Sequence, residues 1–352
     1  MRTSWGAVVA LCSLPSVVLA GGTIKIGENQ SVTVGGGLRT SINFVEDGAP
    51  SGDDFSHDFT LNSARLYLGG QVTKGIFAEF NTEVNSGNED SVRVLDAVVK
   101  IEYTEGFRIW AGRFLPPSDR ANLDGPYYMP LWNYPFVSGF PAIFAGRDDG
   151  VAVWGQFKGG KFKYQTGVFQ GTKGGPNQSD SPLLAGRAVL NLRDPEPGYY
   201  NSSTYWGSKK ILAVAVTAQA QSDAAGTPTA PSDFSGLEVD VLFEQPMSGG
   251  SVFTAEGAFY NFDWGKTNSA TGSAFYAWAG YLLGGKMGPG QLQPIVRYQS
   301  FDSDVTGHDT TQLDAAVNYI VAGDNARFHA TYSKLGGDAD GSSFSLGAQL
   351  QF

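Results

Sequence analysis

The sequence predicts an all-β fold, a transmembrane antiparallel β-barrel of about 16 strands with one long loop folded into it. Two observations support this fold class. After residue 30, apolar and polar residues alternate with a period of two in one segment after another, which is typical of strands with one apolar and one polar face. Short and long connections also alternate between these segments. The composition, with 47 glycines, 13% aromatic and 16% charged residues, does not by itself separate membrane from soluble proteins.

Residues 1–20 have the features of a signal peptide that is removed on export. Arg2 supplies a positive charge, residues 6–19 are apolar but too short for a spanning helix, and Ala20 offers a small-residue cleavage site. Cys12, the only cysteine, lies in this segment. We therefore expect an exported mature chain, residues 21–352, that forms one barrel domain without disulfides.

Each strand segment is expected to turn its apolar residues to lipid and its polar residues to the lumen. In the first segment, apolar residues from Val32 to Phe44 alternate with polar ones such as Arg39. The apolar faces of the later segments begin at Ala64, Ile76, Leu95, Gly186, Leu212, Leu237, Phe253, Leu292, Leu313 and Phe344. Most segments are about ten residues long, which suits a tilted strand that crosses a bilayer.

The connections fall into two classes. Tight turns are expected at residues 74–75, 105–106, 159–160, 247–250, 284–285 and 323–324, and longer loops at 46–57, 85–91, 171–182, 222–233, 263–272 and 302–309. Short periplasmic turns and long outer loops are typical of outer-membrane barrels. A soluble lectin-like sandwich also alternates and is the competing fold. Aromatic residues near strand ends on the apolar face, such as Tyr298 and Tyr332, favour the barrel because they would form an interfacial girdle.

One connection, residues 115–146, is much longer than the others. It is rich in proline and aromatic residues and has neither a strand nor a helix period. Loops of this length are usually functional or disordered, and so many aromatic side chains need a surface to pack against. We expect the loop to fold into the barrel and narrow its bore, with Asp119, Arg120 and Asp124 as the constriction charges. A lid on the outer surface is the alternative.

Charges that line a water-filled barrel determine which solutes pass. The alternation directs both signs inward, and the expected pore-lining residues are Arg39, Arg65, Arg187, Arg193, Arg297, Glu79, Glu83, Glu238, Asp240 and Glu256. Arginine suits anions because its planar fork binds oxyanions through two hydrogen bonds. A transverse field between arginines and carboxylates is one interpretation. Salt bridges that stiffen the wall are the other.

Other classes of function find little support. The net charge of −10 argues against nucleic acid as a partner. The three histidines, His57, His308 and His329, complete neither a nucleophile–base–orienter set nor a metal-ligand spacing, so we expect no enzyme activity and no cofactor or metal. The outer loops are acidic. They could hold divalent cations that bridge to anionic lipopolysaccharide, or simply keep the loops solvated.

Several stretches, in a fixed order along the mature chain, resemble the phosphate-selective porin O/P family. They are residues 35–39 (Gly-Gly-Gly-Leu-Arg), 65–71 with 77–80, 112–117, 146–151, 194–200 and the final Phe352. The resemblance implies a homotrimeric outer-membrane porin whose third outer loop folds inward and whose Phe352 is an assembly signal. One departure matters. Residues 115–146 contain no lysine, so the phosphate specificity of the family is not implied.

Two functions remain at this stage. The first is a channel for passive diffusion of small hydrophilic solutes or inorganic ions, with an anion bias, surrounded by outer-membrane lipid and lipopolysaccharide. The alternative is a structural barrel sheath around an electron-transfer cytochrome or another partner. A sheath must keep its bore clear, whereas a channel narrows it. The long aromatic loop therefore favours the channel.

Overall fold

The computed structural model describes residues 21–88 and 91–352, and the expected signal peptide lies outside these residues. The strands are β1 (Gly22–Gly27), β2 (Gln30–Val45), β3 (Asp58–Thr73), β4 (Ile76–Val84), β5 (Arg93–Ile101), β6 (Arg108–Phe114), β7 (Asp148–Phe157), β8 (Phe162–Phe169), β9 (Leu183–Asn191), β10 (Ile211–Thr227), β11 (Ala230–Pro246), β12 (Val252–Asp263), β13 (Gly272–Leu282), β14 (Gln291–Ser303), β15 (Asp309–Ala322), β16 (Ala326–Gly337) and β17 (Ser342–Gln351). The helices are α1 (Arg120–Tyr128) and the 3-10 turns η1 (Ser86–Asn88) and η2 (Ser248–Gly250). Within the described ranges, no helix is long and apolar enough to span a bilayer.

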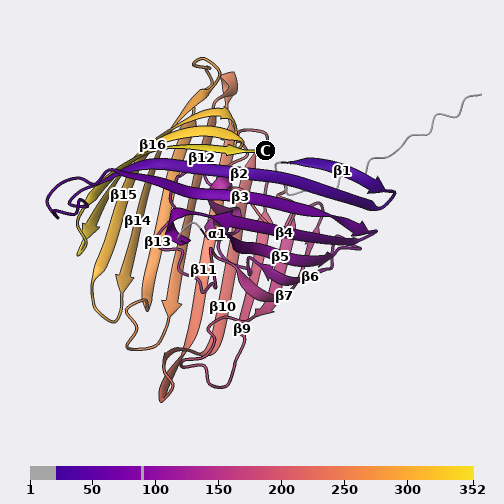
Figure 1. Cartoon of the computed structure of the whole chain (residues 1–352), viewed down its shortest axis with the longest axis horizontal. Helices are drawn as coiled ribbons and strands as arrows, with labels where there is room; N and C mark the ends of the chain where they lie inside the picture. Colours follow the sequence, from indigo (N-terminus) through magenta and orange to yellow (C-terminus); the bar gives the residue numbers. More distant parts are fainter. Residues whose placement is uncertain (1–20, 89–90) are drawn as a thin grey trace, which may run out of the picture.

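Strands β2 to β17 form a closed antiparallel ring, which confirms the predicted barrel of sixteen strands (Figure 1). Each strand pairs with the next in sequence, and β17 closes onto β2 with Leu346 opposite Ile42. The additional strand β1 pairs with β2 in a hairpin. It lies on the same edge of β2 as β17, beyond the point where Phe352 and Gly36 exchange backbone hydrogen bonds of 3.0 Å.

The two faces of the wall are inverted relative to a soluble protein. In β11, Leu237 and Val239 are 51% and 46% exposed, whereas the alternating Glu238 and Asp240 are 0% and 1% exposed. Lipid is the solvent for the outer face, so apolar side chains lie there and polar ones point to the interior. Closing the sheet also pairs the backbone groups that hydrocarbon would leave without a partner. The alternation was therefore interpreted correctly.

Some details of the wall were predicted wrongly. Residues 222–233, expected as a loop, instead extend β10 and β11 to a tight turn after Thr227. Leu95 was expected to face lipid but is 0% exposed. A bulge explains this, because Asn81 pairs with Asp96 while the adjacent Thr82 pairs with Val94, so Leu95 is the extra residue. The connection from β9 to β10, residues 192–210, is long although it lies on the short-turn side.

The sequence had suggested that the long loop is wholly irregular, but it contains a short helix. Residues 115–147 connect β6 to β7 and contain α1, which begins after Asp119. Gly125 has a φ of 69° and a ψ of 173°, and Pro126 follows it, so the helix is kinked at this point. Counted from β2, this connection is the third outer loop, as the family resemblance implied. We call it loop 115–147.

Candidate functional site: the interior of the barrel

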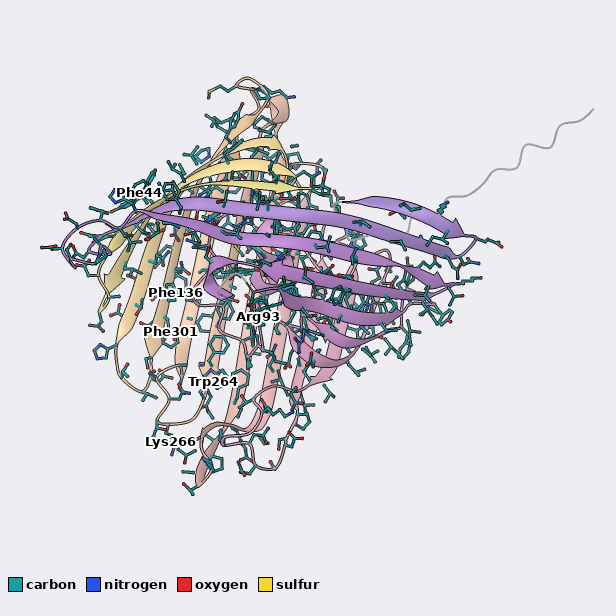
Figure 2. The ribbon with its side chains drawn as sticks, viewed as in Figure 1. Phe44, Arg93, Phe136, Trp264, Lys266 and Phe301 are labelled. Atoms are coloured by element: carbon teal, nitrogen blue, oxygen red, sulfur yellow. The ribbon has the colours of Figure 1, made fainter. Side chains whose placement is uncertain are left out.

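Loop 115–147 crosses the interior and is held by polar side chains that point inward from the wall. An irregular, proline-rich segment leaves backbone carbonyls without partners, and buried carbonyls require them. Wall side chains donate to its carbonyls at 2.7–3.3 Å, from Arg39 to Trp132, Gln219 to Pro117, Arg297 to Asn133, Asn318 to Pro130, Arg327 to Pro126 and Gln349 to Tyr127. Phe136, labelled in Figure 2, donates its N–H to Oε1 of Gln299 at 2.9 Å. The loop therefore lies inside the bore and contacts strands around most of the ring.

The three charges predicted for the constriction lie in the interior but are buried. Asp119, Arg120 and Asp124 are 0%, 0% and 4% exposed. Burial raises the pKa of Asp119, and the hydroxyl of Tyr260, which donates to its Oδ2 at 2.8 Å, opposes that rise. Burial also raises the pKa of Asp124 well above its ordinary value, although Ser203 donates to this carboxylate. Asp119 and Arg120 therefore contact protein groups, whereas Asp124, although nearly buried, borders the inner of the two cavities described below.

Arg120 is the centre of a buried ion network. Its Nη1 and Nη2 each lie 2.8 Å from an oxygen of Glu196, and its Nε lies 3.6 Å from Oδ1 of Asp240. Arg187 Nη1 lies 2.5 Å from Asp240 and 3.4 Å from Glu238. Burial opposes ionisation of Glu196, but Arg120 outweighs it and the pKa of Glu196 is lowered. Removing one partner of such a network typically costs about 3–5 kcal/mol. For these wall residues, the salt-bridge interpretation holds.

A second segment, residues 192–210, enters the barrel from the opposite mouth. The ring of Tyr199 stacks on Trp110 at 4.5 Å between centroids, its hydroxyl donates to the carbonyl of Leu115 at 2.9 Å, and its carbonyl accepts from Gln165 at 2.6 Å. The wall of β6 to β8 turns buried aromatic side chains inward here, namely Trp110, Phe114, Trp154 and Phe169. Residues 194–200 contributed to the family resemblance, but their place inside the barrel was not expected from the sequence. The length of the proline- and glycine-containing run after β9 was the available signal.

Arg39 and Arg327 form a second cationic region, on β2 and β16. The guanidinium of Arg39 lies 3.9 Å from the centroid of Trp132, and the ring of His329 stacks on the same Trp132 at 3.9 Å. Among the described residues, no carboxylate forms an ion pair with Arg39 or Arg327. These two cations are buried at 4% and 1% exposure and are held by carbonyls and rings.

Two cavities lie on the β2–β5 side of loop 115–147. The outer cavity, of about 470 Å³, is lined by Arg39, Asn62, Arg65, Glu83, Asn85, Asn122, Pro126, Trp132, Asn133, Tyr134, Ser138, Phe140, Ala142, Ala145 and Gly146. The inner cavity, of about 440 Å³, lies toward the short-turn mouth and includes Arg65, Tyr67, Glu79, Asp96, Asp124, Tyr127, Arg147, Tyr200, Trp206, Lys209 and Asp324 in its lining. Arg65 lines both cavities. Its Nη2 lies 3.1 Å from Glu83 and its guanidinium 5.1 Å from the Tyr127 ring centroid.

The predicted pore-lining residues divide into three groups. Arg39, Arg65, Glu79 and Glu83 line the cavities. The others on the wall also point inward but are engaged in contacts there, namely Arg187, Glu238, Asp240, Arg297 and Glu256. Arg193 differs, because β9 ends at Asn191. It is exposed at the end of the barrel, where Nη1 contacts Gln245 at 3.0 Å.

Comparison with known proteins decides the family. The model of the phosphate-selective porin O and P family matches residues 32–352. The chain belongs to this family. Similar solved barrels include an anion-selective porin from Comamonas acidovorans (TM-score 0.61, 14% identity, 92% of this chain and 100% of that chain covered) and OprB of Pseudomonas putida (TM-score 0.64, 11% identity, 92% and 94% covered). OmpT of Vibrio cholerae in its trimer form is also similar (TM-score 0.59, 15% identity, 92% and 100% covered). A comparison with curated proteins finds no match.

The protein is thus a porin of the bacterial outer membrane, and its function is that of a passive channel. The family and the barrel are those of a channel rather than of an enzyme. The sequence identity to the solved structures is low, so the similarity to them establishes only the fold. The selectivity of this porin has to be argued from its own side chains.

Proposed function

We propose that small hydrophilic solutes and ions cross this porin between loop 115–147 and the β2–β5 wall, and that Arg65 lies at the narrowest part of this route. The observation that carries the proposal is the sharing of Arg65 by the outer and inner cavities. Elsewhere in the ring, the buried network of Arg120 and the aromatic side chains of β6 to β8 fill the interior.

The proposed roles of the loop charges follow from this route. Asp119, Arg120 and Asp124 belong to the constriction as the groups that fix loop 115–147 in the bore. Arg65, Glu83 and Tyr127 form the surface that a solute passes. This division is supported by position, because Asp119 and Arg120 are fully buried and line neither cavity, whereas Arg65 lines both. Asp124 borders the inner cavity, but its carboxylate accepts a hydrogen bond from Ser203.

The outer cavity supports an anion bias. Its charged lining residues are Arg39, Arg65 and Glu83. Glu83 is paired with Arg65, so Arg39 contributes an additional positive charge that no described carboxylate pairs with. A fixed charge beside a narrow, partly desolvated path attracts ions of opposite sign more strongly than it would in bulk water. The acidic outer loops lie farther from the path and are screened by salt.

A reversal potential across a salt gradient in a planar bilayer tests this proposal. We expect an anion preference in dilute salt that falls in Arg39→Gln and falls further in Arg39→Gln/Arg65→Gln. Lys334→Gln is the matched control, because Lys334 lies near the outer end of β16 and pairs with Asp340 there. Equal reversal potentials for all these variants would contradict the proposed route.

The alternative function, a sheath around an electron-transfer partner, finds no support in the interior. Loop 115–147 and residues 192–210 both occupy the bore and bond to each other through Arg120 and Glu196. A partner that passes through the ring would have to displace both segments and break buried ion pairs, which is costly. The filled interior favours the diffusion channel.

We also propose a homotrimer in which the wall around β6 and β7 contacts a neighbouring copy. β6 has only 7 residues, whereas a tilted strand needs about 9–11 to cross a bilayer. At its outer end, Arg113 points outward and forms two hydrogen bonds of 2.7 and 2.8 Å with Asp149 of β7. An ion pair facing lipid is unfavourable, so a protein neighbour is the better environment for it.

A further inference from the structure

We propose that residues 192–210 are a second filter, which limits solute size at the short-turn mouth and is coupled to loop 115–147 through the pair of Arg120 and Glu196. The proposal rests on the route described above, since it assigns the inner half of that route to a different segment. A connection of this length is not needed to join β9 to β10. Those strands already meet beside Asp194, whose N–H donates to the carbonyl of Lys210 at 2.9 Å.

The segment forms one side of the inner cavity. Its contributions to the lining are Pro197, Tyr200, Asn201, Ser202, Thr204, Tyr205, Trp206, Ser208 and Lys209. The opposite side consists of wall residues of β3 to β5, among them Tyr67 and Asp96. Without the segment, the space between the wall and α1 would open directly to the mouth. The segment therefore determines the cross-section of the route below Arg65.

The segment is held in place rather than hanging as a free loop. Pro195 and Pro197 restrict its backbone, and Tyr199 is stacked on Trp110. Farther along, Glu244 of β11 accepts from the N–H of Tyr205 and from the N–H of Gly207, both at 2.9 Å. An element fixed at several points can set a size limit, because it does not yield to a passing solute.

The coupling to loop 115–147 comes from charges that neither segment could bury alone. Glu196 is 1% exposed, and both of its oxygens lie 2.8 Å from the guanidinium of Arg120. Tyr205 donates to the same carboxylate at 2.7 Å. Arg120 also contacts Asp240 on the wall, so it joins the segment, the loop and the barrel. Displacing one segment leaves a buried charge on the other without its partner, which disfavours independent motion.

The main test replaces residues 195–209 by an Asn-Gly turn, since Asp194 and Lys210 are already paired and this dipeptide suits a tight hairpin. Single-channel conductance and the swelling of porin-containing liposomes in neutral sugars of increasing size are measured. We expect higher conductance and entry of larger sugars. Because the sugars are uncharged, the change in size limit is separate from any change in charge selectivity.

The second variant, Glu196→Gln, tests the coupling without removing the segment. We expect larger current fluctuations and a smaller rise in the sugar size limit. Asp340→Asn is the control, because it removes the carboxylate of an exposed ion pair with Lys334 and should leave both readouts unchanged. If the shortened variant fails to assemble, the sugar size limit of Glu196→Gln alone tests whether residues 192–210 act as a filter.

The outcomes separate the inference from the proposed function. A folded, heat-modifiable shortened variant with wild-type conductance and size limit would overturn the second filter, even though the wild-type porin conducts. A Glu196→Gln variant that matches wild type in fluctuation and size limit would overturn the coupling. If the Arg39 and Arg65 variants leave the reversal potential unchanged, the proposed route is refuted instead. The size limits measured with neutral sugars do not depend on that result.

Discussion

Arg39 holds Trp132 in two ways. Its guanidinium lies 3.9 Å from the centroid of the indole ring, and its Nη2 donates to the backbone carbonyl of the same residue at 2.7 Å. A single wall arginine thus positions both the side chain and the backbone of loop 115–147. The same arginine lines the outer cavity, so the position of the loop and the charge of the route depend on one group.

Trp132→Leu should loosen loop 115–147. The substitution removes the stacking with Arg39 and with His329, each typically worth about 0.5–2 kcal/mol. We expect noisier single-channel currents and a higher mean conductance, while the barrel still assembles. Trp264→Leu is the control, because Trp264, labelled in Figure 2, follows β12 and does not contact Arg39 or His329. Its ring packs on Phe234 instead. Quiet, wild-type currents for Trp132→Leu would contradict this role.

Deletion of residues 118–139 should raise conductance and relax the solute size limit, because it removes the part of the loop that crosses the bore. The deletion also removes Arg120 and would leave Glu196 buried without its partner. We therefore combine it with Glu196→Gln. Arg187 still pairs with Asp240 in this variant. Unchanged conductance in a correctly folded deletion variant would show that loop 115–147 does not narrow the route.

Asp324 should make the selectivity depend on pH. It lies in the turn between β15 and β16 and lines the inner cavity, and burial raises the pKa of its carboxyl to about 6. Above this pH the carboxylate is charged and repels anions, and below it the group is neutral. We expect the anion preference to increase as the pH falls from about 7 to about 5. Asp324→Asn should reduce this change, and equal pH profiles for the two proteins would exclude Asp324 as its source.

Removal of Phe352 should impair assembly. Phe352 is 74% exposed on the outer face, and its backbone N–H and carbonyl pair with Gly36 where β17 meets β2. Its loss removes two backbone hydrogen bonds at the closing point of the ring and the aromatic group that the family resemblance identifies as an assembly signal. The amount of heat-modifiable porin in outer-membrane fractions is the measurement. Phe352→Tyr serves as the control and should assemble normally.

Asp149→Lys should weaken the proposed trimer. The change places a lysine at position 149, opposite Arg113 on the outward face. Two like charges at this point are unfavourable in a protein contact. We expect a smaller trimer fraction in unheated gel samples and in cross-linking. Asp304→Lys, in an exposed outer loop, is the control. A trimer fraction equal to wild type would place the contact on another part of the wall.

The wall of this porin was predictable from sequence because the bilayer imposes a local rule. Leu237, Glu238, Val239 and Asp240 alternate in the sequence, and each faces the side that the alternation predicts. The bulge at Leu95 was not predictable in this way, since one extra residue breaks the period without a change in composition. In a strand without such a bulge, the direction of a wall side chain follows from counting residues from its neighbour.

The contents of the barrel were much less predictable, because they depend on contacts between distant segments. Arg120 was expected as a constriction charge, and its partner Glu196 lies 76 residues away in a connection that entered the prediction only as part of the family resemblance. The sequence indicates that charges point inward. It does not indicate which of them pair and which remain available, so Arg187 and Arg39 seemed equivalent until their partners were known.

The hydrogen bonds of loop 115–147 also make its position depend on the closure of the barrel. The carbonyls of Pro126 and Tyr127 have Arg327 and Gln349 as their donors, from β16 and β17, the strands that lead up to the closure of the ring onto β2. Without those two strands, these two carbonyls lose their side-chain donors and require water instead. The loop therefore reaches its full set of hydrogen bonds only when β16 and β17 are in place beside it. Through Arg39 of β2 as well, it joins the two ends of the wall from the inside.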